Sequence, residues 1–290
     1  MIGSLNKIID KEEEIASTEV RSKGISLVAI DVDDTLLTEE LTILPAVKEA
    51  IQRAQQQGVT ITLATGRMYR STLPYAKELG LALPLIVYQG ALIQDSQTGE
   101  VLWHRPVEKK LATEVLAFLQ AKELHVNLYV KDHLYMEKLG QEGSDYIKLA
   151  RVPVTLIPDH RALLAEEETT KILAIGDPEK LEKLEAEGRQ LWGDQLFVTR
   201  SKPFYLEFMD RRAGKGEALG FLAEQLQIDQ QNVMAIGDSY NDIDMLEYAG
   251  VAVAMGNGPR EVQKSADYVA PTNREGGVAT ALERFVLKNF

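Results

Sequence analysis

The feature of this sequence that most constrains its fold is an alternation of strand-like and helix-like segments after residue 24. Runs at residues 25–31, 59–66 and 84–88 have strand character, and segments 44–58 and 68–80 have the spacing of amphipathic helices. The first run, ISLVAID, is almost continuously apolar, which is typical of a strand buried on both faces. The alternation predicts a parallel sheet with helical crossovers.

Two hairpin patterns interrupt this alternation in the middle of the chain. The segment ALIQDSQTGEVLWHR is expected to turn around Thr98 and Gly99, and LHVNLYVKDHLYMEK near Lys131 and Asp132. Helical segments and further strands follow them, a mixture that is typical of a separate α+β unit. From GKGEALGFLAEQLQI onward, the helix–strand alternation resumes and ends in a C-terminal helix.

We therefore predict an α/β protein with a doubly wound, Rossmann-like parallel-sheet core and an inserted α+β domain. The expected divisions are an N-terminal extension (1–24), a first core part (25–88), the inserted domain (89–200) and a second core part (201–290). A chain of 290 residues is long enough to build two hydrophobic cores.

Composition argues against several function classes. The formal net charge of −12, the pI near 5.0 and the absence of a basic stripe argue against nucleic-acid binding. No apolar run approaches the roughly eighteen residues of a membrane span. The absence of cysteine excludes disulfides and thiolate metal sites and agrees with a cytoplasmic location, as does an N-terminus without the apolar core of a secretory signal. Nothing in the sequence indicates the oligomeric state.

Acidic and hydroxyl side chains follow the ends of several predicted strands. Asp31 ends the first strand, Asp33 and Asp34 lie just beyond it, Thr65 follows the second strand and Asp238 ends a later one. Ligands of open parallel sheets bind beyond the carboxyl ends of the strands. We therefore expect these side chains to converge on one rim of the sheet.

These residue types suit phosphoryl transfer. Crowded carboxylates need a compensating cation, and Asp31 and Asp238 are suitable ligands for Mg²⁺. Lys215, at the start of the helix after the insertion, and the Thr65 hydroxyl can neutralise the transferring group. The Asp31 carboxylate can attack phosphorus and form an aspartyl phosphate. Asp33 can serve as acid and then base, since residues i and i+2 of a strand project to one side.

Four segments, taken together and in order, resemble the sequential motifs of the haloacid dehalogenase superfamily of phosphatases: DVDDTLL, LATGR, GKGEAL and GDSYNDIDML. Three more resemble its Cof-type subfamily, whose members carry a large α/β cap: VYQGALIQDSQTGEVL, AVAMGNG and TNREGGVATALE. The resemblance covers roughly residues 25–290. It implies that the inserted domain is a cap that closes over the site and chooses the leaving group.

The resemblance implies a catalytic role for each matching position. Asp31 is the implied nucleophile and a metal ligand. Asp33 is the implied acid and base, and its backbone carbonyl also faces the metal. Asp238 completes the protein ligands of Mg²⁺. Thr65 and Lys215 are implied to bind the transferring phosphoryl group.

Supporting roles follow from the same resemblance. Asn241 and Asp242 are implied to orient Lys215, the phosphate or metal-bound waters from behind the first ligands. Further contacts with the phosphate or substrate are expected from Gly66, Arg67, Asn241 and the backbone of Asp34. For Arg67, an ion pair with an acid is an equal alternative.

Some positions depart from the family pattern or stay open. Asp34 stands where many members have Gly, Gln89 replaces the usual Asn at the cap junction, and Gly214 stands where Ser or Asn is more usual. Three cap or hinge residues are open between a structural role and a contact with substrate: Lys171, Tyr205 and Glu207.

The expected function is Mg²⁺-dependent hydrolysis of a small phosphorylated metabolite through an aspartyl phosphate. By resemblance, the candidate substrates are sugar phosphates, pyridoxal phosphate and flavin-pathway phosphate esters. A phosphomutase that uses the same intermediate stays open as an alternative, because both enzymes share the first half-reaction. A regulatory binding protein with little turnover is the other alternative, and the retained catalytic residues argue against it.

Overall fold

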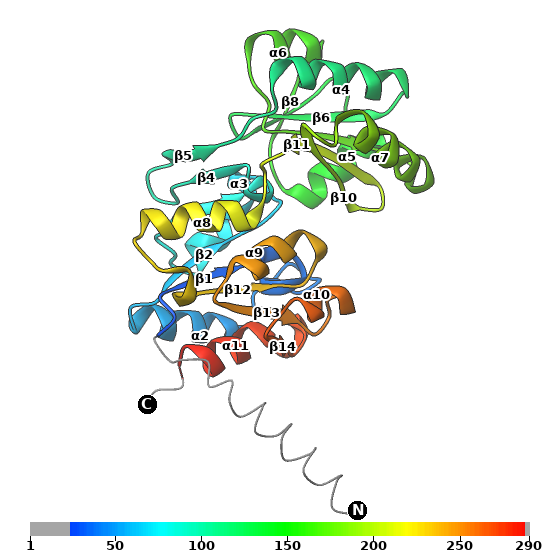
Figure 1. Ribbon diagram of the computed structural model, residues 1–290. Helices are drawn as coiled ribbons and strands as arrows, with labels where there is room; N and C mark the ends of the chain where they lie inside the picture. Colours follow the sequence, from blue (N-terminus) through cyan, green and yellow to red (C-terminus); the bar gives the residue numbers. More distant parts are fainter. Residues whose placement is uncertain (1–23, 288–290) are drawn as a thin grey trace, which may run out of the picture.

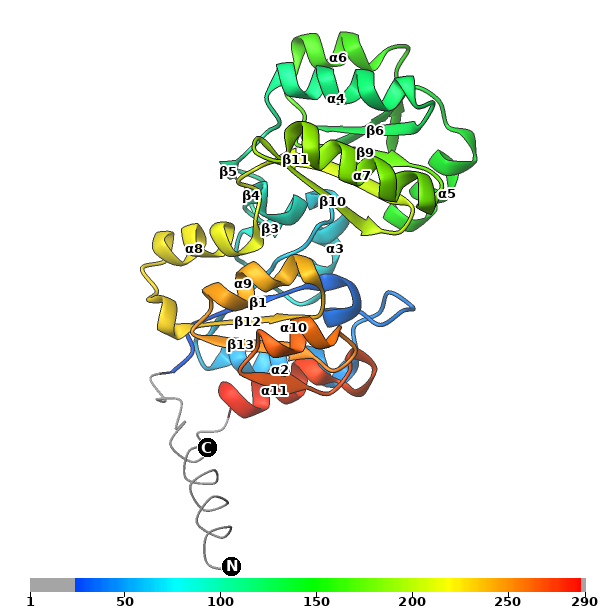
Figure 2. The same ribbon diagram turned by 45° about the vertical axis from the view of Figure 1, so that its right-hand side comes forward.

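The computed structural model describes residues 24–287, so the predicted N-terminal extension lies outside the described residues apart from Gly24. Figures 1 and 2 show the chain as a core unit, drawn at the bottom, and a second unit of strands and helices above it. We call this second unit the cap. Within residues 24–287, no helix combines the length and apolarity needed to cross a membrane.

The core is built on a five-stranded parallel sheet with the strand order β14-β13-β12-β1-β2. The strands are β1 (Leu27–Ile30), β2 (Thr60–Leu63), β12 (Val233–Gly237), β13 (Val251–Met255) and β14 (Tyr268–Ala270). Leu27 of β1 is in register with Thr60 on one side and with Val233 on the other. Strands from the first and the last part of the chain therefore pair in parallel within one sheet, which confirms the predicted α/β core.

Helices cover both faces of this sheet. They are α2 (Pro45–Gln56), α3 (Tyr69–Glu78), α8 (Lys215–Gln225), α9 (Ile243–Tyr248), α10 (Arg260–Lys264) and α11 (Gly277–Phe285). α2 and α11 pack with Val28 and Ile30 on one face, and α8 and α9 pack with Leu27 and Ala29 on the other (Figure 1). Successive strand residues point to opposite faces, so a sheet covered on both sides requires the unbroken apolar run LVAI.

The third predicted strand differs from the expected parallel arrangement. A parallel bridge between Ala64 and Ile86 is its link to the core sheet, and otherwise it pairs antiparallel with the hairpin that follows. These strands are β3 (Leu85–Val87), β4 (Leu92–Gln94) and β5 (Val101–His104). The chain reverses at residues 88–90, which all have positive φ, and this tight reversal brings β4 back along β3.

The domain boundaries at 88/89 and 200/201 stay predictions. The hairpin β4–β5, which we assigned to the inserted domain, pairs with β3 beside the core. The chain passes between core and cap twice, and the turn that follows β3 packs against the residue just before α8. A Cβ at Gly90 would overlap the carbonyl group of Gly214, so glycine permits the contact.

The cap contains a six-stranded mixed sheet in the order β10-β11-β9-β6-β7-β8. Its strands are β6 (His125–Val130), β7 (His133–Met136), β8 (Val154–Leu156), β9 (Lys171–Ile175), β10 (Leu196–Lys202) and β11 (Tyr205–Asp210). Its helices are α4 (Lys109–Ala121), α5 (Gly140–Ala150), α6 (His160–Glu166) and α7 (Pro178–Trp192). The predicted hairpin turn is confirmed at Lys131 and Asp132. Both residues have positive φ, as the two central residues of a type I′ turn require.

The turn of this hairpin also fastens the cap to the core. The buried Asp132 carboxylate accepts hydrogen bonds from the backbone N–H and the Nε of Arg70, at 2.9 and 3.1 Å. It also accepts one from the hydroxyl of Tyr88, at 2.9 Å. Arg70 lies in the first turn of α3 and Tyr88 follows β3, so one carboxylate joins the cap to two core elements.

Asp132→Ala is expected to lower the free energy of unfolding by roughly 1–3 kcal/mol, because the buried Tyr88 hydroxyl and the Arg70 N–H groups lose their acceptor. Urea unfolding followed by circular dichroism measures this change. Asp145→Ala is the control, since Asp145 is exposed and should shift stability by about 0.5 kcal/mol at most. Equal stability of the two variants would contradict the fastening role of Asp132.

Candidate active site

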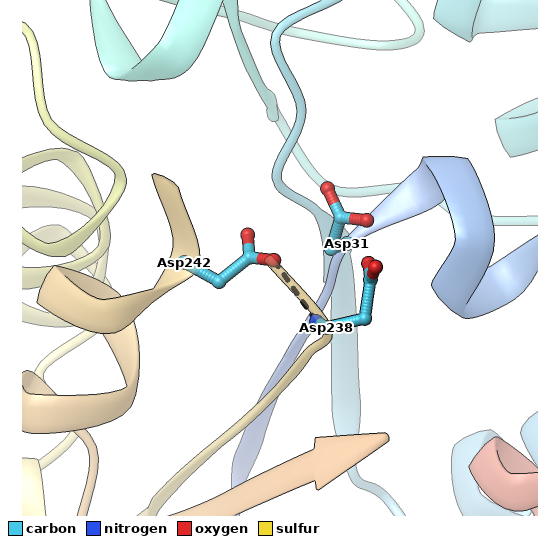
Figure 3. Close-up of side chains that lie close together, drawn as sticks. All are labelled: Asp31, Asp238 and Asp242. Carbon is cyan, nitrogen blue, oxygen red and sulfur yellow. Dashed lines mark hydrogen bonds between the residues drawn. The ribbon is translucent and has the colours of Figure 1, made fainter. Parts of the chain in front are cut away.

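Two adjacent core strands end in aspartates that lie close together. Asp31 follows β1 and Asp238 follows β12, and both strands run in the same direction. The backbone N–H of Asp31 donates to Ile236 O at 2.9 Å, and this bond keeps the carboxyl ends of the two strands level with each other. Figure 3 shows the carboxylates of Asp31 and Asp238 side by side with that of Asp242. The predicted rim is therefore where the acids meet.

Lys215 is the buried cation at this rim. It begins α8, it is 1% exposed, and its Nζ donates to Asp31 Oδ1 and to Asp242 Oδ1, both at 2.6 Å. Burial lowers the pKa of the ammonium, but the charges of Asp242 and Asp31 outweigh it and hold that pKa above its ordinary value. Lys215 is therefore a fixed positive charge at neutral pH.

Asp242 positions its neighbours. Its Oδ1 accepts from Lys215, and its Oδ2 accepts from the backbone N–H groups of Asp238 and Ser239, at 3.0 and 2.9 Å. Figure 3 shows the bond from the Asp238 N–H as a dashed line. Both carboxylate oxygens are thus occupied by protein donors. A Cβ at Gly237 would lie within 2.8 Å of three atoms of the Asp242 side chain, so glycine gives this carboxylate its room. This geometry supports the expected role of Asp242 behind the first metal ligands.

The acids offer oxygen ligands of the kind that Mg²⁺ prefers. One ligand oxygen each from Asp31, Asp238 and Asp242 lie within 4.8 Å of one another. Asp238 Oδ1 accepts from Thr35 Oγ1 at 2.8 Å, and within residues 24–287 the Oδ2 atoms of Asp31 and Asp238 accept no hydrogen bond. Two open carboxylate oxygens beside a third, fully used carboxylate fit a hard divalent cation.

The electrostatics of these acids indicate a shortage of positive charge. Burial, followed by the charges of Asp242 and Asp238, raises the pKa of Asp31 well above its ordinary value, although Lys215 opposes this. Burial and the charge of Asp242 raise the pKa of Asp238 to about 7. Lys215 alone therefore does not compensate the cluster, and a bound cation would favour the ionised carboxylates.

Asp33 does not belong to the cluster formed by these three carboxylates. It forms a paired contact with Arg67, whose Nε and Nη2 donate to Asp33 Oδ2 and Oδ1 at 2.8 and 2.5 Å. The strand geometry that we expected for Asp31 and Asp33 is wrong, because β1 ends at Ile30 and residues 32–36 form a turn. Of the two alternatives for Arg67, the structure shows the ion pair.

Asp34 has a backbone conformation that explains the family pattern. Its φ is 63° and its ψ is 5°, in the left-handed region where glycine is favoured and where Asp and Asn are the best tolerated alternatives. Its carbonyl oxygen accepts a hydrogen bond from Asn257 Nδ2 at 2.8 Å. The acid can therefore occupy a position where many superfamily members have Gly.

The loop after β2 lies next to the end of β1. The Ala64 N–H donates to Ile30 O, which places Thr65 beside Asp31 on neighbouring strands. The Thr65 hydroxyl is buried and accepts from the Arg67 N–H at 3.2 Å. A Cβ at Gly66 would overlap the amide of Gln89, which in turn accepts from Asn241 Nδ2 at 2.8 Å. Gln89 thus connects the Thr65 loop to the Asn241 turn.

Two residues that support the site were missed by our sequence analysis. Thr35 holds Asp238, and Asp244 Oδ2 accepts from the N–H of Gly216 at the first turn of α8, at 2.9 Å. Thr35 lies inside DVDDTLL and Asp244 inside GDSYNDIDML. Their position within the motifs was the available signal, but their partners are distant in sequence.

Lys215→Met is expected to lower the free energy of unfolding by roughly 3–5 kcal/mol near neutral pH in EDTA, because it leaves the carboxylates of Asp31 and Asp242 without their counter-ion. Asp31→Asn should instead leave that free energy unchanged or raise it. The pKa of Asp31 is higher in the folded state than in the unfolded chain. Ionisation of Asp31 therefore lowers the free energy of unfolding at every pH above the pKa that Asp31 has in the unfolded chain. Urea unfolding of both variants tests the contrast, and a Lys215→Met variant as stable as the parent would refute it.

Comparison with known proteins agrees with this geometry. A family model described as haloacid dehalogenase-like hydrolase matches residues 28–282. The chain is 32% identical over 273 residues to the 5-amino-6-(5-phospho-D-ribitylamino)uracil phosphatase YcsE of Bacillus subtilis (strain 168), over 93% of this chain and 100% of YcsE. It is 28% identical over 273 residues to the pyridoxal phosphate phosphatase YbhA of Escherichia coli (strain K12), over 87% of this chain and 96% of YbhA. The crystal structure of TM0651 from Thermotoga maritima matches with a TM-score of 0.81 and 31% identity, over 89% of this chain and 97% of that chain. This chain belongs to the haloacid dehalogenase-like hydrolase family.

Proposed function

We propose that this protein is a Mg²⁺-dependent phosphatase that hydrolyses a small phosphorylated metabolite. The observation that carries the proposal is the buried Lys215, which holds Asp31 and Asp242 at the rim where Asp238 also ends its strand. The names of YcsE and YbhA support phosphate monoesters as the substrate class. Because those two relatives differ in leaving group, they support a range of substrates rather than one.

In the proposed reaction, a carboxylate oxygen of Asp31 attacks phosphorus while the bond from phosphorus to the ester oxygen breaks. The departing oxygen takes a proton from Asp33. Water then attacks phosphorus, its proton passes to Asp33, and the bond from phosphorus to Asp31 breaks, which releases phosphate. Thr65 and Lys215 bind the phosphoryl oxygens and offset their charge. Asp31, Asp238 and the carbonyl of Asp33 would hold Mg²⁺, which supplies further charge neutralisation.

The ion pair with Arg67 bears on the role of Asp33. Partial desolvation raises the pKa of Asp33, whose side chain is 48% exposed, but the hydrogen bonds and charge of Arg67, with weaker contributions from Lys202 and Lys215, leave that pKa lowered overall. A carboxylate in this state suits the base step. For the acid step, a phosphoryl group that attracts the Arg67 guanidinium would free Asp33 to carry a proton.

Asp31→Asn is expected to abolish phosphate release, since an amide oxygen is a poor nucleophile. Release of inorganic phosphate is measured across a panel of sugar phosphates, pyridoxal phosphate and ribityl phosphate esters, with Mg²⁺ and with EDTA. Asp145→Asn, an exposed cap residue, is the matched control and should keep full activity. Activity that survives EDTA or Asp31→Asn would contradict the proposal. An isomerised phosphosugar in place of free phosphate would indicate a mutase.

Asp33→Asn is expected to slow hydrolysis of esters with poor leaving groups most, because only these need protonation of the departing oxygen. The general-acid contribution is roughly 10²–10⁴-fold. Comparing kcat/KM for an alkyl phosphate and for p-nitrophenyl phosphate separates the two cases. An equal loss on both substrates would refute the acid role of Asp33.

A further inference from the structure

The face of the cap sheet that is turned toward the core carries an acid and a base that the proposed mechanism does not use. They are Lys171 of β9 and Glu207 of β11, two strands that pair antiparallel, and each is 4% exposed. Their neighbours Leu173 and Met209, two residues further along each strand and so on the same face, belong to the apolar cluster that includes core residues. The intervening Ile172 and Phe208 pack with α4 and α7 on the opposite face.

Lys171 crosses from the cap to the loop that follows β2. Its Nζ donates to the carbonyl oxygen of Gly66 at 3.3 Å, next to Thr65. The ammonium lies 4.9 Å from the ring centroid of Tyr129 and 5.9 Å from that of Tyr88, so two aromatic rings lie beside it. This charge therefore sits directly beside the loop that we expect to bind the phosphoryl group.

Glu207 lacks a partner for one of its oxygens. Its Oε1 accepts from the Ser201 hydroxyl at 2.6 Å and lies 3.4 Å from Lys171 Nζ. Its Oε2 is buried and has no hydrogen-bond partner among the described residues. An unsatisfied buried acceptor is costly in folded proteins, so Glu207 offers an open acceptor next to the Lys171 ammonium, which itself contacts the Thr65 loop.

We propose that Lys171 and Glu207 form the subsite for the leaving group and that this subsite binds the hydroxyl groups of a polyol or sugar phosphate. The inference rests on the proposed phosphatase function. The two charges cancel, so the pair does not favour a charged leaving group. An ammonium donor next to a carboxylate acceptor matches hydroxyl groups, which accept and donate at once. The contact of Lys171 with Gly66 places these hydroxyls near the ester bond.

The test compares two substrates, ribitol 5-phosphate and p-nitrophenyl phosphate, whose leaving group has no hydroxyl once it is esterified. Glu207→Gln keeps the shape of the side chain and an acceptor for Ser201 but removes the charge. It is expected to lower kcat/KM for ribitol 5-phosphate by roughly ten- to a hundredfold and to leave p-nitrophenyl phosphate turnover little changed. Lys171→Met should show the same selectivity. Glu142→Gln, an exposed glutamate of the cap, is the control and should change neither substrate.

A loss of equal size on both substrates would overturn the subsite, since it would indicate a structural role in the cap. No loss on either substrate would also overturn it, as would turnover of p-nitrophenyl phosphate by an enzyme that hydrolyses no polyol or sugar phosphate. Failure of the folded parent protein on both substrates would instead contradict the proposed phosphatase function itself.

A folding check accompanies these assays, because both residues are buried. If circular dichroism shows that Glu207→Gln does not fold, Ser201→Ala takes its place, since it frees Glu207 Oε1 and leaves the buried charge pair intact. It is expected to lower kcat/KM for ribitol 5-phosphate more than for p-nitrophenyl phosphate. An equal effect on the two substrates would overturn the proposal.

Discussion

The site depends on one buried ammonium group. Lys215 lies between Asp31 and Asp242 with almost no access to water, and it joins the end of β1 to the turn after β12. Such pairs are stable only when the partners are held in good geometry. Here the backbone N–H groups at residues 238 and 239 hold Asp242, and Asp244 holds the start of α8. The geometry of the acids is therefore set by the strand ends and by α8 together.

This arrangement leaves the acidic cluster short of positive charge. The pKa values of Asp31 and Asp238 are raised because burial and neighbouring carboxylates outweigh the single lysine. Without a further cation, the ionised carboxylates of this cluster destabilise the folded state. A cation bound between them would relieve this repulsion. The same crowding that weakens the fold would favour the binding of a divalent cation, as the proposed function requires.

The cap contributes to the site through contacts that reach the core loops. Asp132 binds Arg70 and Tyr88, Lys171 reaches Gly66, and the charge of Lys202 affects the pKa of Asp33. These contacts come from strands and turns of the cap that are far apart in sequence. A substrate held between the two units would therefore touch cap side chains on one side and the strand ends of the core on the other.

The sequence by itself determined the α/β core, the two hairpins β4–β5 and β6–β7 and the family, because apolar runs, helical spacing and ordered motifs are local properties. It also indicated which acids follow the strands. Only the tertiary structure decided that Asp33 pairs with Arg67, that β3 pairs with the hairpin after it, and that Asp242 accepts from Lys215 through Oδ1 and from backbone N–H groups through Oδ2. The physical reason is that these features depend on contacts between segments that are far apart in the sequence, or on the direction in which the chain turns. No local sequence pattern specifies which of these segments come together. Asp34 illustrates the difference. The sequence shows an acid where many superfamily members have Gly, but only the fold shows the left-handed backbone conformation that both residue types tolerate.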